Sequence, residues 1–244
     1  MQEQAERYDV TRYERPSVTV DVVIFTLIHQ ELHVLLVQRR NWPFEGCWAI
    51  PGGFVDMDES LEWAARRELE EETGVRDVYL EQLYTFGEVG RDPRTRVISV
   101  AYIALVRADV QQIRVSEESH AVRWFPVRTL PEQLAFDHAQ ILAYAIGRLR
   151  SKLEYTTLAF QLLPEQFSIL ELKHIYEQIL GEKLDKGNFY RKIKEADLLE
   201  EVHVVREERK ARGRPTQLWR VRRDRALEKQ FVFRWREDRL ERGG

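Results

Sequence analysis

Apolar residues in the first 150 positions follow the period of strands in some stretches and that of helices in others. Residues 17–27 are rich in β-branched side chains, which predicts a buried strand, and residues 32–38 follow a short turn as the second strand of a hairpin. Further strands are predicted at residues 78–86, 97–106 and 122–126. Helical spacing predicts one helix that ends at Gly74 and another at residues 137–152. This order predicts an α/β fold with a mixed sheet covered on both faces.

The pattern changes after residue 155. Residues 156–167 form a predicted connector, and Ser168 and Glu171 then have the spacing of a capping box that opens a helix. That helix ends at Gly181, and Asp185 can cap a second helix that continues to residue 196. Strands at residues 202–207 and 217–221 follow, joined by a basic tip. Two helices, a short turn and a β-ribbon are the layout of a winged helix-turn-helix domain.

Composition adds bounds to this picture. The chain has 244 residues, of which 43% are hydrophobic, and is long enough for two small domains. A net charge of −3 gives no overall sign of a nucleic-acid or membrane partner, so such a role must come from local charge. Cys47 is the single cysteine, and no signal peptide or long apolar run occurs, which predicts a cytoplasmic protein without a membrane partner. Residues 1–16 are predicted to be an arm, and the tail at 226–244 has no functional interpretation.

Acidic side chains occupy the face of the first helix that should be buried. On a helical projection Glu68 and Glu72 lie within roughly 20° of Leu61, and Glu71 lies about 80° away. Carboxylates turned inward need a positive partner, and oxygen ligands at this density suit Mg²⁺ or Mn²⁺. The alternative is a solvated glutamate-rich helix. The acidic residues that favour the start of this helix are Asp56, Asp58 and Glu59. Its apolar stripe consists of Leu61, Ala64 and Ala65.

Fixed positions in this segment spell a signature. Gly53, five residues, Glu59, seven residues and then the run RELEEETGV at residues 67–75 resemble a complete Nudix box. The resemblance implies an α/β/α sandwich that binds or hydrolyses a nucleoside diphosphate linked to another moiety. It implies that Glu59 supports the helix entry and Arg67 orients Glu68. The implied catalytic residues are Arg67, Glu68, Glu71 and Glu72, and the implied ligands of Mg²⁺ or Mn²⁺ are Glu68, Glu71, Glu72 and Gly52.

Two loops carry polar residues where loops commonly meet ligands. The loop at residues 90–94 contains Arg91, Asp92 and Arg94, and Asp137 and His138 precede the second helix. The alternatives are ordinary surface arginines, an N-cap at position 137 and a surface histidine at position 138. The general base is not identified, since Glu117 and Glu118 are candidates by position only and the helix carboxylates can also activate water.

Three runs extend the resemblance. VQRRNWPFEGCWAIPGGFVD, GRDPRTRVISVAYIALV and LAFDH are similar to the Nudix subgroup whose ligand is ADP-ribose or a related sugar nucleotide. The resemblance implies phosphate or ribose contacts from Arg39, Arg91 and Arg94. It makes Asp92, Asp137 and His138 further candidates for ligand binding.

Positive charge collects in the second segment, where residues 186–225 hold 13 Lys or Arg against 7 Asp or Glu. Side chains on the outer face of the second helix suit a major groove, and a basic ribbon tip suits phosphates or the minor groove. The alternative is a protein-interaction or dimerisation module with a solvated basic face. The candidate DNA contacts are Lys186, Asn188, Tyr190, Arg191 and Lys194 on the helix and Arg212 and Arg214 at the tip.

The order of the two segments resembles the Nudix-related transcriptional regulators, the NrtR family. The run LEL..IYE.ILG..LDK.NFYRKI..ADLLE and the tip at residues 213–215 carry this resemblance. It implies a homodimeric regulator in which an ADP-ribose-type ligand controls binding of operator DNA. Many members have a broken box, whereas this chain keeps every carboxylate, so we expect retained Mg²⁺-dependent pyrophosphatase activity. The alternative is a dedicated ADP-ribose-type pyrophosphatase. The predicted domains are residues 17–155 and 156–225.

Overall fold

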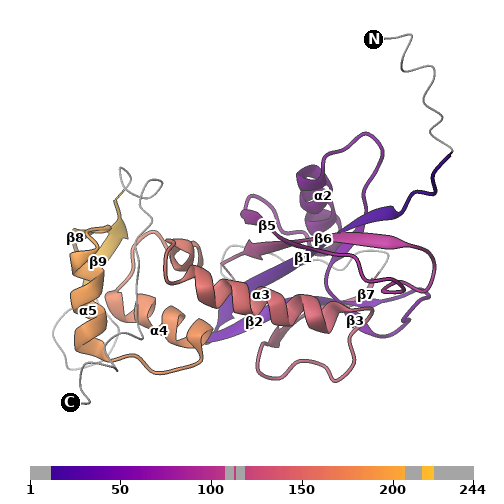
Figure 1. Cartoon of the computed structure of the whole chain (residues 1–244). Helices are drawn as coiled ribbons and strands as arrows, with labels where there is room; N and C mark the ends of the chain where they lie inside the picture. The colour runs from indigo at the N-terminus through magenta and orange to yellow at the C-terminus, as the bar shows by residue number, and fades with distance from the viewer. Residues whose placement is uncertain (1–11, 108–112, 114–118, 207–215, 223–244) are drawn as a thin grey trace, which may run out of the picture.

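The computed structural model describes residues 12–107, 113, 119–206 and 216–222 (Figure 1). Every strand and helix predicted within these residues is present, with ends shifted by a few residues. Two short strands and a 3-10 helix, η1, were not predicted. The elements are β1 (Ser17–Ile28), β2 (Glu31–Arg39), β3 (Trp48–Ala49), β4 (Gly52–Phe54), α2 (Leu61–Thr73), β5 (Tyr79–Phe86), β6 (Val97–Leu105), β7 (Ser119–Pro126), α3 (His138–Lys152), η1 (Leu158–Leu162), α4 (Ile169–Leu180), α5 (Lys186–Glu195), β8 (Leu199–Arg206) and β9 (Thr216–Val221).

The larger sheet has the strand order β3-β2-β1-β6-β5, with β4 paired to β1 and β7 paired to β2. The pairing of β1 with β6 is parallel, and the remaining pairs are antiparallel. The sheet is therefore mixed, which confirms the prediction.

Strand β1 runs through the centre of this sheet and is buried on both faces. Val20, Val22 and Ile24 pack in the same cluster as α2, whereas Val23 and Phe25 pack in the cluster of α3. The alternation follows from the two-residue period of a strand, and it explains why apolar residues at 22–25 follow one another without interruption. Helices α2 and α3 cover opposite faces of the sheet (Figure 1), so the predicted α/β/α sandwich is confirmed.

A smaller lobe contains α4, α5 and the antiparallel pair of β8 and β9. The predicted capping box opens α4, because Ser168 Oγ accepts from Glu171 N at 3.1 Å and Glu171 Oε2 accepts from Ser168 N at 2.7 Å. Asp185 caps α5 by accepting from Asn188 N at 2.7 Å. These contacts confirm the two-helix layout. Helix α5 lies on the side of the lobe that faces away from the larger sheet (Figure 1).

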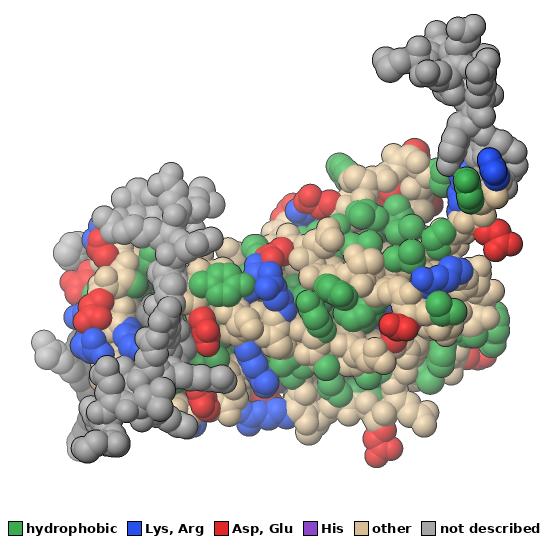
Figure 2. All heavy atoms as spheres, viewed as in Figure 1, with side chains coloured by type: hydrophobic (Ala, Val, Ile, Leu, Met, Phe, Trp, Pro, Cys, Tyr) green, Lys and Arg blue, Asp and Glu red, His purple; other side chains and the backbone are tan. Residues whose placement is uncertain are grey.

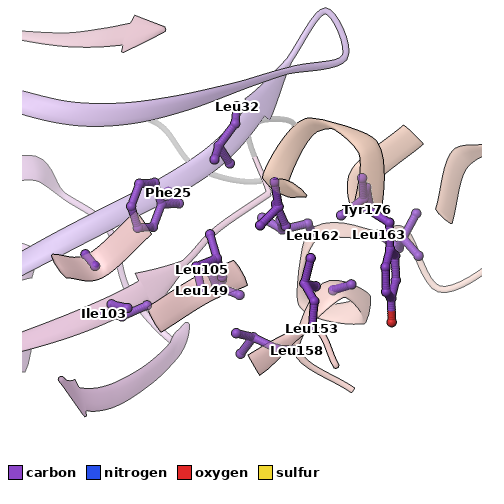
Figure 3. Close-up of a cluster of buried hydrophobic side chains, with 14 of the residues drawn as sticks. Phe25, Leu32, Ile103, Leu105, Leu149, Leu153, Leu158, Leu162, Leu163 and Tyr176 are labelled. Carbon is purple, nitrogen blue, oxygen red and sulfur yellow. The ribbon is translucent and has the colours of Figure 1, made fainter. Parts of the chain in front are cut away.

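The two lobes share one hydrophobic cluster. It joins side chains of the larger sheet and α3 to η1 in the connector and to α4 (Figure 3). Leu158 and Leu162 in η1 are buried, so the connector packs into the core. At the far end of α3, Arg150 Nε donates to Ile179 O in the last turn of α4 at 2.9 Å. The larger lobe and the smaller lobe are therefore in direct packing contact through α3.

Within the described residues, no helix combines the length and the apolar character needed to cross a membrane.

Candidate functional site

Helix α2 begins later than its acidic residues suggested. Ser60 is the N-cap and accepts from Trp63 N at 3.3 Å, so Asp56, Asp58 and Glu59 precede the helix and do not form its first turn. Glu59 Oε1 instead accepts from Asp56 N at 2.9 Å and closes the turn before the helix. At the other end Gly74 has a φ of 76°, a left-handed conformation that favours glycine, and confirms the predicted stop.

Arg67 holds three carboxylates together. Its guanidinium donates to Glu59 Oε1 at 2.6 Å, to Glu68 Oε1 at 2.7 Å and to Glu71 Oε2 at 3.2 Å. It also donates to the carbonyl of Phe54 in β4 at 3.0 Å. The hydrogen bond to Glu59 is the largest cause of a raised Arg67 pKa, and the same bond lowers the pKa of Glu59. Arg67 therefore links the carboxylates of Glu68 and Glu71 in α2 to the backbone of β4.

The three carboxylates among the metal-ligand candidates do not share one environment. The Glu68 side chain is 12% exposed, but the Glu71 side chain is 60% exposed, so the expectation that both turn inward is wrong for Glu71. Its 80° offset from the apolar stripe leaves it at the edge of the buried face. Glu72 is half-buried and its Oε2 accepts from Gly52 N at 2.8 Å.

The donor set fits a hard divalent cation, because it consists of carboxylate oxygens at one edge of α2. In the present arrangement Glu68 and Glu71 pair with Arg67, and Glu72 pairs with a backbone N–H. No group of three His, Cys, Asp or Glu side chains in the described part of the chain lies close enough to surround an ion. The role of Gly52 as a ligand stays a prediction.

Gly53 lies directly against the Glu68 side chain. A Cβ added there would lie 2.1 Å from Glu68 Oε1 and 2.5 Å from its Cδ. The Glu68 carboxylate thus occupies the space that any other residue would fill. This contact gives a physical reason for the glycine at the start of the box.

A pocket of about 190 Å³ opens beside β4, between the loop of residues 90–94 and the start of α3. Five of the six predicted ligand-binding residues line this pocket. The sixth, Asp137, forms an ion pair with one of the five, Arg91. The lining residues are Thr19, Asp21, Arg39, Asn41, Trp42, Ile50, Gly52, Gly53, Phe54, Arg91, Asp92, Arg94, Phe136 and His138.

The mouth of the pocket carries two arginines against an aromatic ring. The guanidinium of Arg39 lies 4.9 Å from the Phe136 ring centroid and that of Arg94 lies 5.8 Å from it. Arg94 forms a bidentate pair with Asp92, with Nη2 2.7 Å from Oδ2. Arg39 donates to the Pro43 carbonyl at 2.8 Å and, among the described residues, forms no ion pair. Burial, followed by repulsion from Arg94, lowers the pKa of Arg39.

The pocket floor contains two carboxylates around one arginine. Arg91 binds Asp137 through both oxygens, with distances of 2.6 and 2.9 Å, and its Nη2 lies 3.5 Å from Asp21 Oδ2. The Arg91 side chain is only 4% exposed, which excludes the reading as an ordinary surface arginine. Asp137 takes the N-cap position of α3 but its side chain makes no capping bond, because it is committed to Arg91.

His138 is buried at the same floor, so it is not a surface residue. Its Nδ1 accepts from Ile50 N at 2.8 Å, and Nε2 lies 3.6 Å from Asp21 Oδ1. An Nδ1 that accepts a backbone N–H leaves the proton of a neutral ring on Nε2. Burial lowers the pKa of His138 in spite of the nearby Asp21. His138 therefore presents an N–H donor at Nε2.

Sequence reasoning missed several residues of this pocket. Asp21 is the charged residue inside the apolar run of β1, and a buried charge of that kind is itself a functional signal. Phe136 lies in the LAFDH run but was given no role. Thr19 has no distinguishing pattern, since threonine is common in strands. Glu117 and Glu118, the base candidates, lie outside the described residues.

Helix α5 presents the candidate DNA contacts. Lys186, Arg191 and Lys194 are exposed. Arg191 is paired with Glu195 at 3.2 Å and donates to Asn188 Oδ1 at 2.7 Å. Acidic and basic side chains lie side by side over this lobe (Figure 2).

Tyr190 differs from its expected place on the face opposite the core. It is partly buried against the hydrophobic cluster, and Lys186 Nζ lies 6.0 Å from its ring. Arg212 and Arg214 lie outside the described residues.

Comparison with known proteins assigns both parts of the chain. A NUDIX domain model matches residues 16–145, and an NrtR DNA-binding winged helix domain model matches residues 159–221. The chain is 41% identical over 219 residues to the ADPR responsive transcriptional repressor NtrR of Acinetobacter baylyi, covering 88% of this chain and 85% of the repressor. It is 37% identical over 130 residues to an ADP-ribose pyrophosphatase of Methanocaldococcus jannaschii, covering 53% of this chain and 73% of that enzyme.

A solved structure agrees with these matches. Shewanella oneidensis NrtR, crystallised with a 27mer DNA, superposes with a TM-score of 0.72 at 39% identity and covers 88% of this chain and 97% of the NrtR chain. The Nudix domain and the winged helix domain of this chain are thus matched together, over most of their length, by a repressor and by a solved NrtR structure. The chain belongs to the NrtR family of Nudix proteins with a winged helix domain.

Proposed function

We propose that this protein is a transcription regulator whose Nudix domain binds ADP-ribose or a related nucleoside diphosphate sugar and so controls DNA binding by the winged helix. The observation that carries the proposal is α3, which begins at the ligand pocket and ends on α4. Its fifteen residues span about 22 Å. The similarity to an ADPR responsive repressor supports the same reading.

The pocket offers a place for a diphosphate. Arg39 faces it without an ion-pair partner among the described residues, and Arg94 lies next to it. A guanidinium without a carboxylate partner can bind a phosphate without first breaking an ion pair. We therefore assign the diphosphate to the mouth of the pocket.

Ligand binding can reach α5, the candidate DNA-reading helix, through contacts of α3 and α4. A ligand that displaces the Arg91–Asp137 pair acts on the first turn of α3, and Arg150 carries the other end of α3 onto the last turn of α4. The turn after α4 leads directly into α5. A ligand that binds one orientation of α3 better than another must alter DNA affinity, and DNA must alter ligand affinity by the same factor.

We further propose how the protein is organised to bind operator DNA: its oligomeric state, its domains and its DNA contacts. The protein acts as a homodimer in the cytoplasm, because paired recognition helices can read half-sites about 34 Å apart. The ligand-binding domain comprises residues 17–155 and the DNA-binding domain residues 156–225. Lys186, Asn188, Arg191 and Lys194 are proposed to contact DNA, with Tyr190 supporting the helix, and Arg212 and Arg214 to contact it from the tip.

Fluorescence anisotropy with DNA from upstream of its own operon tests this function. We expect salt-dependent binding that changes when ADP-ribose is added. The Arg191→Ala variant should weaken binding and lower the salt dependence, whereas Arg66→Ala, an exposed arginine of α2, should leave both unchanged. An anisotropy that ADP-ribose does not alter would remove the regulatory role.

A second function, slow hydrolysis of the same ligand, is favoured by the complete set of box residues. Arg67 orients Glu68 and Glu71, and Gly52 N orients Glu72. When bound, Mg²⁺ or Mn²⁺ would neutralise charge on the diphosphate. Water would add to one phosphorus and break the P–O–P link, so ADP-ribose would give AMP and ribose 5-phosphate. Incubation with Mg²⁺ and separation of these products tests the proposal, and unaltered ADP-ribose after long incubation would exclude it.

A further inference from the structure

Two polar groups on the pocket floor have unused hydrogen-bonding capacity. Asp21 Oδ2 accepts from the Ser99 hydroxyl and faces Arg91, whereas Asp21 Oδ1 accepts no hydrogen bond from the described residues. His138 Nε2 lies 3.6 Å from Asp21 Oδ1, which is too long for a hydrogen bond. An acceptor and a donor thus stand side by side on the lining of the same pocket.

Thr19 adds a third group. Thr19 lines the pocket and is 9% exposed. Its buried Oγ1 has no hydrogen-bond partner among the described residues. Thr19 and Asp21 are two residues apart on β1, so their side chains emerge on the same face of the sheet. A buried hydroxyl without a partner destabilises the protein, and a hydrogen bond to a ligand would offset that cost.

The charge of the floor decides which part of a ligand belongs there. Asp21 and Asp137 contribute two negative charges, Arg91 contributes one positive charge, and His138 is neutral, so the floor carries a net charge of −1. A phosphate placed against it would be repelled. A sugar hydroxyl suits it, because one O–H can donate to Asp21 and its oxygen can accept from His138.

We propose that this floor binds the hydroxyl groups of the terminal sugar of the ligand, and that Asp21, His138 and Thr19 determine specificity for it. Asp21 Oδ1 accepts from a sugar hydroxyl, His138 Nε2–H donates to one, and the Thr19 hydroxyl completes the set. The diphosphate then lies at Arg39 and Arg94, outside the floor. The inference rests on the proposed function and deepens it.

The size of the pocket favours the sugar over the nucleoside. Its volume of about 190 Å³ is below the ~300 Å³ at which pockets for whole small molecules begin. It therefore encloses one end of a nucleotide sugar. Flat apolar surface is found at Trp42 and Phe54, which are 68% and 42% exposed, and this suits a base at the rim.

Calorimetric titration with ADP-ribose and with ADP, which lacks the terminal sugar, tests the assignment. Asp21→Asn keeps the shape of the side chain but removes its charge, and we expect it to weaken ADP-ribose binding by about 10- to 100-fold and leave ADP binding unchanged. Asp77→Asn, on the exposed surface, is the matched control and should change neither.

Thr19→Val guards against a folding defect in Asp21→Asn. Because the Thr19 hydroxyl has no partner within the described part of the chain, its removal should not lower the melting temperature of the free protein. It should weaken ADP-ribose binding several-fold and leave ADP binding unchanged. A structural role would instead lower the melting temperature and weaken both ligands equally.

The outcomes separate this inference from the function beneath it. Wild-type protein that binds neither ADP-ribose nor ADP would overturn the proposed function and the inference together. Wild-type protein that binds ADP-ribose, with variants that retain that affinity or lose both ligands in parallel, would overturn the sugar assignment alone. Selective loss of ADP-ribose affinity in both variants would support it.

Discussion

Replacement of Gly53 by alanine tests whether the position of Glu68 matters for chemistry. The new Cβ would lie 2.1 Å from Glu68 Oε1, 2.5 Å from Cδ and 2.8 Å from Oε2, well inside contact distance. The clash involves only the end of a flexible side chain, so the Glu68 carboxylate can rotate away and β4 can keep its place. The fold should therefore survive while the carboxylate leaves its position.

The magnitudes follow from the contacts that would be lost. The displaced carboxylate gives up its 2.7 Å contact with Arg67, whose side chain is 27% exposed. After solvent screening we expect a loss of about 1 kcal/mol in the free energy of unfolding, or ~2–4 °C in melting temperature. Loss of one positioned carboxylate should lower the affinity for Mg²⁺ and the turnover of ADP-ribose by about 10- to 100-fold.

Two other glycines provide the comparison. Gly147→Ala in α3 meets nothing within 4 Å and should stabilise the fold by about 0.5–1 kcal/mol. Gly52→Ala would place its Cβ 2.1 Å from the Val20 carbonyl oxygen, a backbone atom that cannot rotate away, and should prevent folding. Melting curves with and without Mg²⁺, together with release of AMP, measure all three. A Gly53→Ala protein with wild-type turnover and the same Mg²⁺ response would refute the reasoning.

Further expectations concern other elements. Glu72→Gln should lower turnover by about 100-fold or more and leave DNA affinity unchanged, and equal turnover would refute its assignment to the metal. Arg150→Met removes the contact of α3 with α4, so DNA binding should persist while its response to ADP-ribose shrinks in anisotropy titrations; an intact response would exclude this route. Glu195→Gln removes an acid that competes for a basic side chain of α5 and should tighten DNA binding by up to about fivefold, whereas weaker binding would contradict it. Burial raises the pKa of Glu177, but hydrogen bonds from Lys173 and from Leu184 N, with the charges of Lys173 and Lys183, together lower it. The stability that ionised Glu177 contributes is therefore present above its ordinary pKa of 4.5 and is lost as the pH falls through the folded value; in acid melting curves the Glu177→Gln variant should show less of this loss.

The sequence predicted the fold because its local signals agreed with the packing. The double-sided apolar run of β1, the capping box at Ser168 and the left-handed glycine at Gly74 each have one physical solution, and the structure adopts it. The pocket was predicted less completely. Asp21 and Thr19 in β1 line the same pocket as His138 at the start of α3, a tertiary arrangement of distant segments that no local pattern reports.

Glu71 and Tyr190 show where helical projection reaches its limit. A side chain about 80° from the apolar stripe of its helix can be either buried or exposed. The elements that pack beside the helix determine which of the two occurs. Glu71 is exposed, whereas Tyr190 is partly buried against the core cluster. Burial at such boundary positions depends on tertiary contacts.

Anisotropy of operator DNA bound to the full-length protein, measured during a titration with ADP-ribose, tests the central claim most directly. We expect ADP-ribose to change the DNA dissociation constant by a factor of about 5 to 150, and DNA to change the affinity for ADP-ribose by the same factor. Saturating ADP-ribose that binds the protein but leaves the DNA dissociation constant unchanged would contradict it.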